Sequence, residues 1–384
     1  MRHKIALFCA AIIFLVVIPA LAAEPVMDMW EQEAELEWGS VEGPPASGSQ
    51  KASRAMEVPS PIRWPEPALE GPFWKIWGQL QFEASYQKDK DAAGEVERSD
   101  RAVLATAEVF LELTPLPFVR GLVHLLHEDG DSGINLDEGF VVLGQTPEFP
   151  GYLMGGRIYP AVGMFESFML SDPITKEVFE TQATAGEVGW SGDWFSLGLS
   201  CYNAAVREPG DGGGFFANFN LRADLTPPPK ALGGLKLRVG GSYTNNVAGS
   251  GFFEEQVPNQ RMDSLVAGWS LGGSAEYGDF ALLAEYLRAG SFAAGALDYA
   301  PAGSTPQPWA FSLELAWFFA DSWRLAGRWE GGGDLYEEFP ERQYGLTLAW
   351  EPIKNLALAL EYQRGYFAGG AESDVVTSQL SLIF

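Results

Sequence analysis

Two histidines and a run of acidic residues between positions 124 and 138 are the side chains best suited to bind a metal ion. Oxygen-bearing residues surround two glycines there: Asp129, Asp131, Asn135, Asp137 and Glu138. The calcium-binding EF-hand pattern fails, because Gly133 takes the position where the loop needs its third oxygen ligand. His124 and His127 are three residues apart, which places them on opposite faces of a strand. We therefore expect a solvated acidic turn, no metal site and no cofactor.

Groups for catalysis are sparse. The sequence has three histidines in 384 residues, and it contains no Gly-x-Ser-x-Gly, P-loop or CxxC motif. A serine hydrolase at this site would have to use His124 or His127 as its base. Of the two cysteines, Cys9 lies in a segment expected to be removed, so Cys201 has no partner for a disulfide. We expect no enzyme.

The elements that must position these residues show a period of two. From Phe73 onward, apolar residues alternate with polar or small ones over segments of about 10–14 residues, enough to cross a bilayer at a tilt. In residues 215–226, for example, Phe219 and Leu221 fall on one face and Asn220 and Arg222 on the other. Each segment is therefore predicted to be a strand with one apolar face.

Two architectures fit this alternation. A soluble sandwich would bury the apolar face, whereas a membrane barrel would turn it to lipid around a polar lumen. The barrel is favoured because the polar faces carry many charges of both signs, which would be costly in a dry core. Tryptophan and tyrosine also lie near segment ends, as interface girdles do. These aromatic residues are Trp74, Tyr86, Trp269, Tyr277, Trp309, Trp329, Trp350 and Tyr362.

Connection lengths support the same architecture. Sixteen strands are predicted to begin near residues 73, 101, 117, 134, 151, 177, 193, 215, 234, 264, 279, 309, 322, 341, 355 and 375. Long connections near 87–100, 161–176, 207–214, 248–263, 290–308, 333–340 and 367–374 alternate with tight turns. Outer loops and periplasmic turns alternate in this way in bacterial barrels. The fold class is therefore all-β, a transmembrane antiparallel up-and-down β-barrel; fourteen or eighteen strands remain alternatives.

The residues before the barrel indicate export. A basic start, an apolar run from Ile5 to Ile18 and small residues near Ala23 predict a signal peptide over 1–22, with an uncleaved anchor helix as the alternative. Residues 23–70 are acidic and Pro-rich, and are predicted to form a periplasmic linker with a short helix at 29–38. The barrel would occupy 71–384. We expect the bacterial outer membrane as its location.

Charge sets expectations for the pore. The chain has 51 Asp and Glu against 25 Lys and Arg, a net charge of −26, which argues against nucleic acid as a partner. Residues 71–384 keep 41 acids against 20 bases, so the pore should favour cations or neutral solutes. The candidates for lining it are Lys75, Glu83, Glu108, Glu112, Arg120, Arg157, Arg222, Arg238, Glu276, Glu314, Arg324, Arg328, Glu330 and Glu361.

One long connection, residues 161–176, is unusually apolar for an exposed loop. Such side chains should avoid water, so we expect the loop to fold into the lumen and narrow it; contact with lipid or a neighbouring protomer is the alternative. The corresponding loop of the general porins, which this layout resembles, folds inward in this way. The candidate residues are Met164, Phe165, Glu166, Phe168, Met169 and Asp172.

Motifs around this loop resemble the LbtU-type siderophore-porin family. They are LDEGFVVLG at 136–144, GGRIYP at 155–160 with Gly163 and Phe165, SDPIT at 171–175, and Glu180-Thr181. The resemblance covers most of 73–384 in layout and is sharp over 134–190. It implies an outer-membrane barrel that admits iron–siderophore complexes. Family members often carry a longer coiled-coil-like segment after the signal peptide than the short stretch at 29–38 here.

The expected function is diffusion of a small hydrophilic solute, such as a ferric siderophore, through a water-filled barrel. The alternatives are a non-specific diffusion porin and a structural barrel without transport. The expected partners are outer-membrane lipid and lipopolysaccharide, a homo-oligomer, and the barrel-assembly machinery. The last would read the final strand, whose terminal Phe384 resembles the C-terminal assembly signal of outer-membrane barrels.

Overall fold

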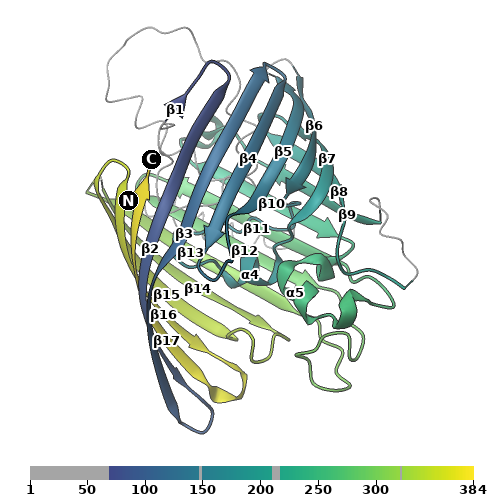
Figure 1. Cartoon of the computed structure of the whole chain (residues 1–384), viewed down its shortest axis with the longest axis vertical. Coiled ribbons are helices and arrows are strands. Elements are labelled where there is room, and N and C mark those ends of the chain that lie inside the picture. Colours follow the sequence, from purple (N-terminus) through teal and green to yellow (C-terminus); the bar gives the residue numbers. More distant parts are fainter. Residues whose placement is uncertain (1–68, 147–148, 210–216, 321) are drawn as a thin grey trace.

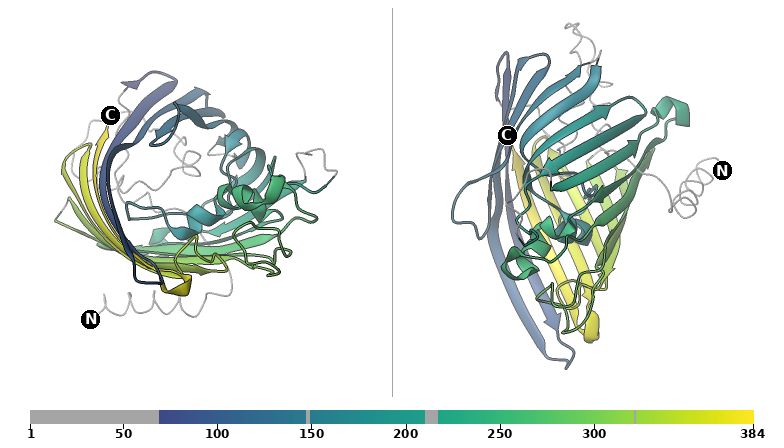
Figure 2. Two further views of the ribbon diagram at one scale, coloured as in Figure 1. Left: turned by 60° about the horizontal axis from the view of Figure 1, so that its bottom comes forward. Right: turned by 90° about the vertical axis from the view of Figure 1, so that its right-hand side faces the viewer.

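The computed structural model of the chain describes residues 69–146, 149–209, 217–320 and 322–384. Its strands form one closed antiparallel sheet in which each strand from β2 to β17 pairs with its neighbours in sequence (Figures 1 and 2). The barrel closes where β17 pairs with β2, from Glu372 opposite Lys90 to Ile383 opposite Gln79. The prediction of a sixteen-stranded membrane barrel is confirmed.

The strands lie close to their predicted positions. A two-residue strand, β1 (Leu69–Glu70), pairs with β2 outside the ring of sixteen. The sixteen are β2 (Trp74–Lys90), β3 (Val96–Leu116), β4 (Val119–Glu128), β5 (Asn135–Thr146), β6 (Phe149–Ile158), β7 (Ala183–Ser191), β8 (Phe195–Tyr202), β9 (Asn218–Leu225), β10 (Lys236–Thr244), β11 (Gly268–Tyr277), β12 (Phe280–Ala289), β13 (Trp309–Phe319), β14 (Trp323–Gly333), β15 (Arg342–Ile353), β16 (Leu356–Tyr366) and β17 (Glu372–Ile383).

The predicted apolar face points outward. Leu346 on β15 and Leu360 on β16 expose 53% and 54% of their surface, and Leu80, Phe82 and many like them are exposed too. A water-soluble protein does not leave so extended an apolar surface uncovered. The inner face of the same strands carries the polar and charged side chains that are buried inside the barrel. The outside of the barrel is therefore the surface that contacts lipid.

Aromatic rings border this surface in two rows. One row lies toward the tight turns: Phe280, Trp317, Phe319, Trp323 and Trp350. The other lies toward the long connections: Trp269, Tyr286, Trp309, Phe311 and Trp329. Along β13 the rows are separated by about 26 Å of strand, or about 20 Å across the membrane at a tilt of about 40°. This spacing fits the hydrocarbon layer, so these two rows are the interface girdles.

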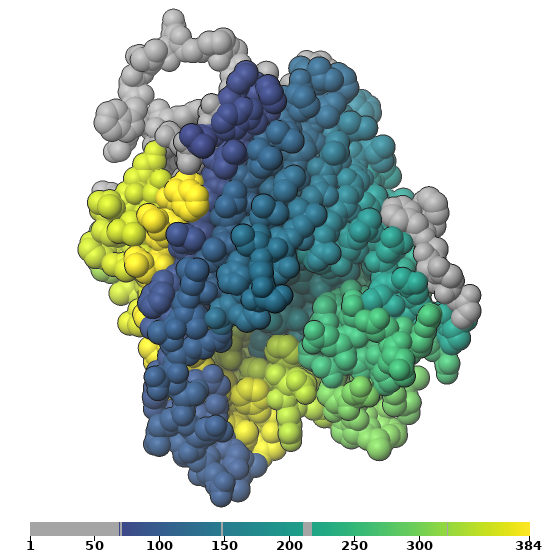
Figure 3. Space-filling model, in the orientation of Figure 1, coloured from purple at the N-terminus to yellow at the C-terminus, as the bar shows by residue number. Residues whose placement is uncertain are grey.

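Two connections differ most from their predicted bounds. The first was expected over 87–100, but β2 continues to Lys90 and β3 starts at Val96, because the two strands keep pairing beyond the barrel wall. This hairpin projects past the rim at the bottom of Figures 1 and 3. The sixth strand was expected near 177, but an inward-packed helix, α4 (Ile174–Phe179), occupies that position and the strand begins at Ala183.

Helical turns and apolar side chains pack against one another at the end of the barrel that carries the long connections. Helix α5 (Gly251–Gln256) lies beside α4, and Phe253 contacts Phe179 with 5.7 Å between ring centroids. These loops appear in green at the lower right of Figure 3. The remaining short helices are η2 (Pro229–Leu232), η3 (Val247–Gly249), η4 (Pro258–Gln260) and η5 (Ala368–Gly370). This packing joins α4 to the other long connections.

Among the described residues, none of the helices is both long and apolar enough to cross a membrane. The predicted signal peptide at 1–22 and helix at 29–38 lie outside the described residues, as does the linker up to residue 68.

Candidate pore constriction

The connection between β6 and β7, residues 159–182, is called the L3 loop below. It lies inside the ring of strands, and its contacts run along the inner face of β10 to β16 (Figure 2, left). Its six candidate constriction residues therefore lie within the barrel and not on the lipid-facing surface. Four glutamates of the barrel wall and two arginines hold it there.

The first two glutamates accept backbone N–H groups from the start of the loop. Glu285 on β12 accepts from Met164 and, at 3.2 Å, from Phe165. Glu314 on β13 accepts from the N–H of Phe168 and the hydroxyl of Ser167, both at 2.7 Å. A carboxylate that accepts amide hydrogens in a buried site fixes the backbone, because each such bond is charge-assisted.

Two further glutamates hold the middle of the loop. Glu361 on β16 accepts from the N–H of Leu170 at 2.6 Å, from that of Ser171 at 3.3 Å, and from the Thr347 hydroxyl at 2.6 Å. Glu330 on β14 accepts from the N–H of Ile174 at 2.8 Å, where α4 begins. The four glutamates come from three adjacent strands and β16, so the loop is anchored across a wide arc of the wall.

Arginines complete this attachment. Arg328 on β14 donates to the backbone oxygen of Ser171 at 2.8 Å and to its hydroxyl at 2.6 Å. The same guanidinium lies 3.2 Å from Glu314 and 2.8 Å from Glu330. Arg238 on β10 forms an ion pair with Glu166 of the loop at 2.5 Å. The buried charges are thus paired or bonded to loop amides, which lowers the cost of removing them from water.

Apolar packing supplements the polar anchors. Phe168 and Met169 are buried among small inner-wall residues such as Ala316 and Ala326. The Met169 methyl group lies only 2.6 Å from where a Cβ on Gly345 would be, so a side chain at that wall position would require Met169 to move. Met164 lies over Gly272 in the same way, with its sulfur 2.9 Å from such a Cβ. The wall is therefore shaped to receive the two methionines.

The two ends of the L3 loop meet at Asp137 on β5. The Tyr159 hydroxyl donates to Asp137 Oδ1 at 2.8 Å, and Gln182 Nε2 donates to the same atom at 2.7 Å. Within the loop, Lys176 is paired with Asp172 at 2.8 Å. Burial raises the pKa of Glu180, at the end of α4, to about 7, although the charge of Lys176 opposes this. The Glu180 carboxyl therefore titrates near neutral pH.

The remaining lining candidates lie mainly on the rest of the wall, in contact with other polar groups. On β2 to β4, Lys75 is opposite Glu112, and Arg120 lies 4.0 Å from Glu112. The other pairs are Glu83 with Gln379, Glu108 with His124, Arg222 with Asp224, and Glu276 with Lys236. Arg324 is buried on the inner face of β14. These side chains lie on the inner face of the barrel; that they line the open pore and set its selectivity stays a prediction.

Arg157 is placed differently from the expectation. It is exposed and shares the outward direction of Leu153 on β6, whereas Tyr152 and Met154 point inward. Its guanidinium donates to the backbone oxygen of Asp137 at 3.0 Å and to the side chain of Gln182. The charge is tolerated outside the barrel because this end of β6 lies at the loop rim, where backbone oxygens and water replace lipid.

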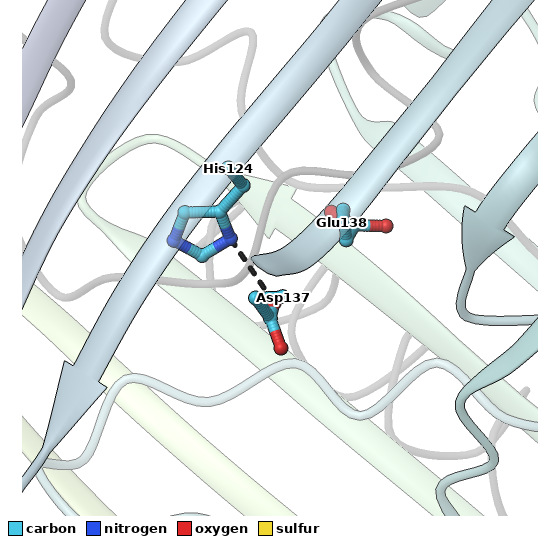
Figure 4. A group of neighbouring side chains, drawn as sticks. All are labelled: His124, Asp137 and Glu138. Atoms are coloured by element: carbon cyan, nitrogen blue, oxygen red, sulfur yellow. Dashed lines mark ion pairs between the residues drawn. The ribbon is translucent and has the colours of Figure 1, made fainter. Parts of the chain in front are cut away.

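The acidic run also departs from the expected solvated turn. Asp129 and Asp131 lie in an exposed turn, but Asp137 is partly buried and Glu138 is only 2% exposed. Both lie beside the inward-pointing His124, as Figure 4 shows. The three residues offer ligand atoms that all lie within 4.8 Å of one another. The expectation of no metal site compared the acids with a calcium-binding loop and His124 with His127, and did not combine His124 with Asp137 and Glu138.

Sequence reasoning also missed Glu285, Ser242 and Glu187 among the inner polar groups. Glu285 anchors the loop, the Ser242 hydroxyl donates to the backbone oxygen of Val162, and Glu187 accepts from Tyr152 at 2.6 Å. The alternation along β12 does place Glu285 on the inner face with Leu283 and Leu287. This alternation along β12 could have identified Glu285 as an inward-facing residue from the sequence.

Comparison with other proteins gives distant relatives. No protein-family model matches the chain. A UPF0422 protein of Coxiella burnetii is 22% identical over 336 residues, which is 82% of this chain and 67% of that protein. A UPF0422 protein of Legionella pneumophila (strain Lens) is 26% identical over 141 residues, 34% of this chain. That second alignment spans 24% of the Legionella protein, about a quarter of its length.

Solved structures share the fold. The anion-selective porin from Comamonas acidovorans has a TM-score of 0.56 at 14% identity, over 81% of this chain and 99% of that one. The Salmonella typhi OmpF complex with daunomycin has a TM-score of 0.54 at 11% identity, over 81% and 97%. Together with the apolar outer surface and its two girdles, this fold places the chain in the bacterial outer membrane.

Proposed function

We propose that this protein is a diffusion porin whose L3 loop narrows a water-filled lumen. The observation that carries the proposal is the attachment of that loop to the inner wall by Glu285, Glu314, Glu330 and Glu361. Sixteen strands enclose a lumen too wide for side chains to fill. A loop fixed inside it by buried charged groups sets the narrowest cross-section, and so limits the size of the solute.

The charges of the inner wall favour cations and neutral solutes over anions. The contacts of Glu285 and Glu361 with the loop go to backbone amides, which carry no net charge. With 41 acids against 20 bases in residues 71–384, the lumen should keep a net negative field, which attracts cations. A reversal-potential measurement in a KCl gradient tests this: the proposal requires potassium to be the more permeant ion, and chloride preference would contradict it.

A ferric siderophore is the finer proposal for the solute. It rests on the resemblance of residues 134–190, a stretch that forms β5, β6, the L3 loop and most of β7. The acidic lumen favours a siderophore complex that is neutral or cationic over one rich in carboxylates. A non-specific porin would pass small sugars equally well whether or not a ferric siderophore is present, and a structural barrel would pass neither.

Liposome swelling separates these functions. The wild-type barrel should admit small sugars up to a sharp size limit, and deletion of residues 164–172 should raise that limit. An unchanged limit would show that the loop does not constrict the pore. A ferric siderophore at micromolar concentration should slow sugar entry if it binds in the lumen. If a correctly folded wild-type barrel caused no swelling, transport would be excluded and the structural barrel would be favoured.

The route to the outer membrane and the assembly of the barrel are further proposals. We propose that a leader at 1–22 directs export, and that the barrel-assembly machinery recognises β17 and Phe384. The N–H and C=O of Phe384 both pair with Gly78 of β2, at 2.9 and 2.8 Å, so this residue also closes the seam. Contact with lipopolysaccharide at the loop rim and formation of a homo-oligomer are further proposals. Cross-linking in native outer membranes would detect the oligomer.

A further inference from the structure

We propose that His124, Asp137 and Glu138 form a binding site for a divalent transition-metal ion of the zinc class, on the inner wall at the root of the L3 loop. His124 lies on β4, and the two acids lie on β5 opposite it. The ring nitrogen Nδ1 of His124 is 3.0 Å from Asp137 Oδ2. One imidazole and two carboxylates are a ligand set that Zn²⁺ and its neighbours bind in proteins.

A break in strand pairing brings two consecutive acids to the same side. His124 pairs with Glu138 but Leu125 pairs with Leu136, so Asp137 is an extra residue in β5. In a regular strand, Asp137 and Glu138 would point to opposite faces. The bulge redirects one of them, and bulges commonly re-aim side chains in this way at functional sites.

The buried carboxylate of Glu138 is the feature that indicates a cation-binding role for this cluster. Its side chain is only 2% exposed, yet its Oε1 atom has no hydrogen-bond partner. The backbone N–H of Tyr159 donates to the carboxylate, which accounts for part of its bonding capacity. A buried, unsatisfied carboxylate oxygen is costly unless something positive binds it. A metal ion between Glu138 and His124 would supply that charge.

The groups around the site orient its ligands. Glu108 on β3 lies 2.9 Å from His124 Nε2, so it fixes the proton on that nitrogen and leaves the Nδ1 lone pair facing Asp137. A carboxylate on the far nitrogen of a metal-binding histidine is a recurrent feature of metal sites. Tyr159 and Gln182 occupy Oδ1 of Asp137, which leaves Oδ2 for the ion.

The distances suit an ion after a small adjustment. Ligand bonds of about 2.0–2.2 Å in a tetrahedral site place ligand atoms about 3.3 Å apart. The His124–Asp137 pair is already near this value, although its geometry is not that of a hydrogen bond. The three ligand atoms span up to 4.8 Å, so the Glu138 side chain must close by about 1–1.5 Å. Water would complete the coordination, because the site faces the lumen.

A histidinium held between Glu108 and Asp137 is the competing explanation for this cluster. That arrangement would place one carboxylate against each ring nitrogen, at 2.9 Å for Glu108 and 3.0 Å for Asp137. It leaves Oε1 of Glu138 without a partner, and it gives no reason for the bulge. The metal site accounts for all three ligands, and it would also stiffen the loop root because Asp137 already holds Tyr159 and Gln182. This inference is independent of which solute the pore admits.

Cobalt and zinc titrations test the site directly. The full, untagged barrel would be folded in detergent, stripped with EDTA and titrated with Co²⁺, whose visible absorption reports on coordination, and with Zn²⁺ by calorimetry. The expected result is one saturable equivalent per barrel. His124→Gln and Glu138→Gln should each weaken binding tenfold or more, and Glu108→Gln about tenfold at unchanged stoichiometry.

His127→Gln is the matched control, since it removes the neighbouring imidazole on the opposite face of β4 and should leave binding unchanged. A folded barrel resists unfolding in the detergent of an unheated gel, so the band of folded protein there shows that a variant has assembled. Should Glu138→Gln fail to fold, the affinities of His124→Gln and Glu108→Gln still show whether this cluster binds the metal ion. No saturable binding to the wild type, or equal affinity in His124→Gln and His127→Gln, would overturn the proposal.

Discussion

Removal of the Glu314 side chain tests how the L3 loop is held. Glu314 is fully buried and accepts from the Phe168 N–H and the Ser167 hydroxyl at 2.7 Å, and from Arg328 at 3.2 Å. A hydrogen bond to a charged group contributes about 1.5–3 kcal/mol, and breaking a buried ion pair by losing one partner costs about 3–5 kcal/mol. Arg328 keeps Glu330 at 2.8 Å, so the loss falls mainly on the loop.

We therefore expect Glu314→Ala to weaken loop attachment by about 3–5 kcal/mol, which raises the detached fraction by roughly 10²–10⁴-fold. The barrel itself should remain folded, because its strand pairing is unchanged. Two assays report the detachment: open-channel current noise in planar bilayers, and cleavage after Phe168 by chymotrypsin added to folded protein in detergent.

Glu83→Ala is the control for this experiment, because Glu83 also lies on the inner wall but accepts from Gln379 of β17 and not from the loop. Its noise and its cleavage rate should match the wild type. If Glu314→Ala behaved like Glu83→Ala in both assays, the wall carboxylates would not be what fixes the loop, and the reasoning would fail.

Three other predictions follow from local geometry. Gly345→Val should push Met169 away from the wall toward the pore axis and lower single-channel conductance, whereas an unaltered conductance would mean that this contact does not position the loop. Burial raises the pKa of Glu180 to about 7 from an ordinary value near 4.5. The protonated carboxyl therefore stabilises the folded loop, fully below about pH 4.5 and progressively less as the pH rises toward 7. This stability, at most about 3 kcal/mol, is lost as pH rises through 7, so proteolysis of the loop should increase from pH 5 to pH 8 and Glu180→Gln should abolish the increase. Gly78→Leu should impair barrel assembly, measured as the folded fraction on cold gels, because its side chain would collide with the Phe384 ring that covers Gly78.

Much of the fold could be predicted because the strands of a membrane barrel alternate strictly between lipid-facing and inward-facing residues. Leu346 and Leu360 had to face lipid, so alternation alone assigned their faces and those of the residues between them. The same parity placed Glu314 and Glu361 on the inner face. It could not reveal that the L3 backbone is their partner, because that contact joins residues more than 140 positions apart.

The predictions that were wrong concern Asp137, Arg157 and helix α4, and each has a physical cause. Asp137 lies in a bulge, and a single extra residue reverses the face that alternation predicts. Arg157 lies at the rim, where a charge can point outward because lipid no longer covers the strand. Helix α4 replaced a predicted strand because Val178 and Phe179 pack against the loop cluster, and that cluster forms only when distant loops meet.

Single-channel recording in a planar lipid bilayer tests the central claim most directly. Folded wild-type barrel should insert and give discrete, ohmic current steps whose size scales with the conductivity of the KCl solution, as a water-filled lumen requires. Deletion of residues 164–172 should enlarge those steps. Insertion without any current step, shown by protein recovered from the membrane, would contradict the account.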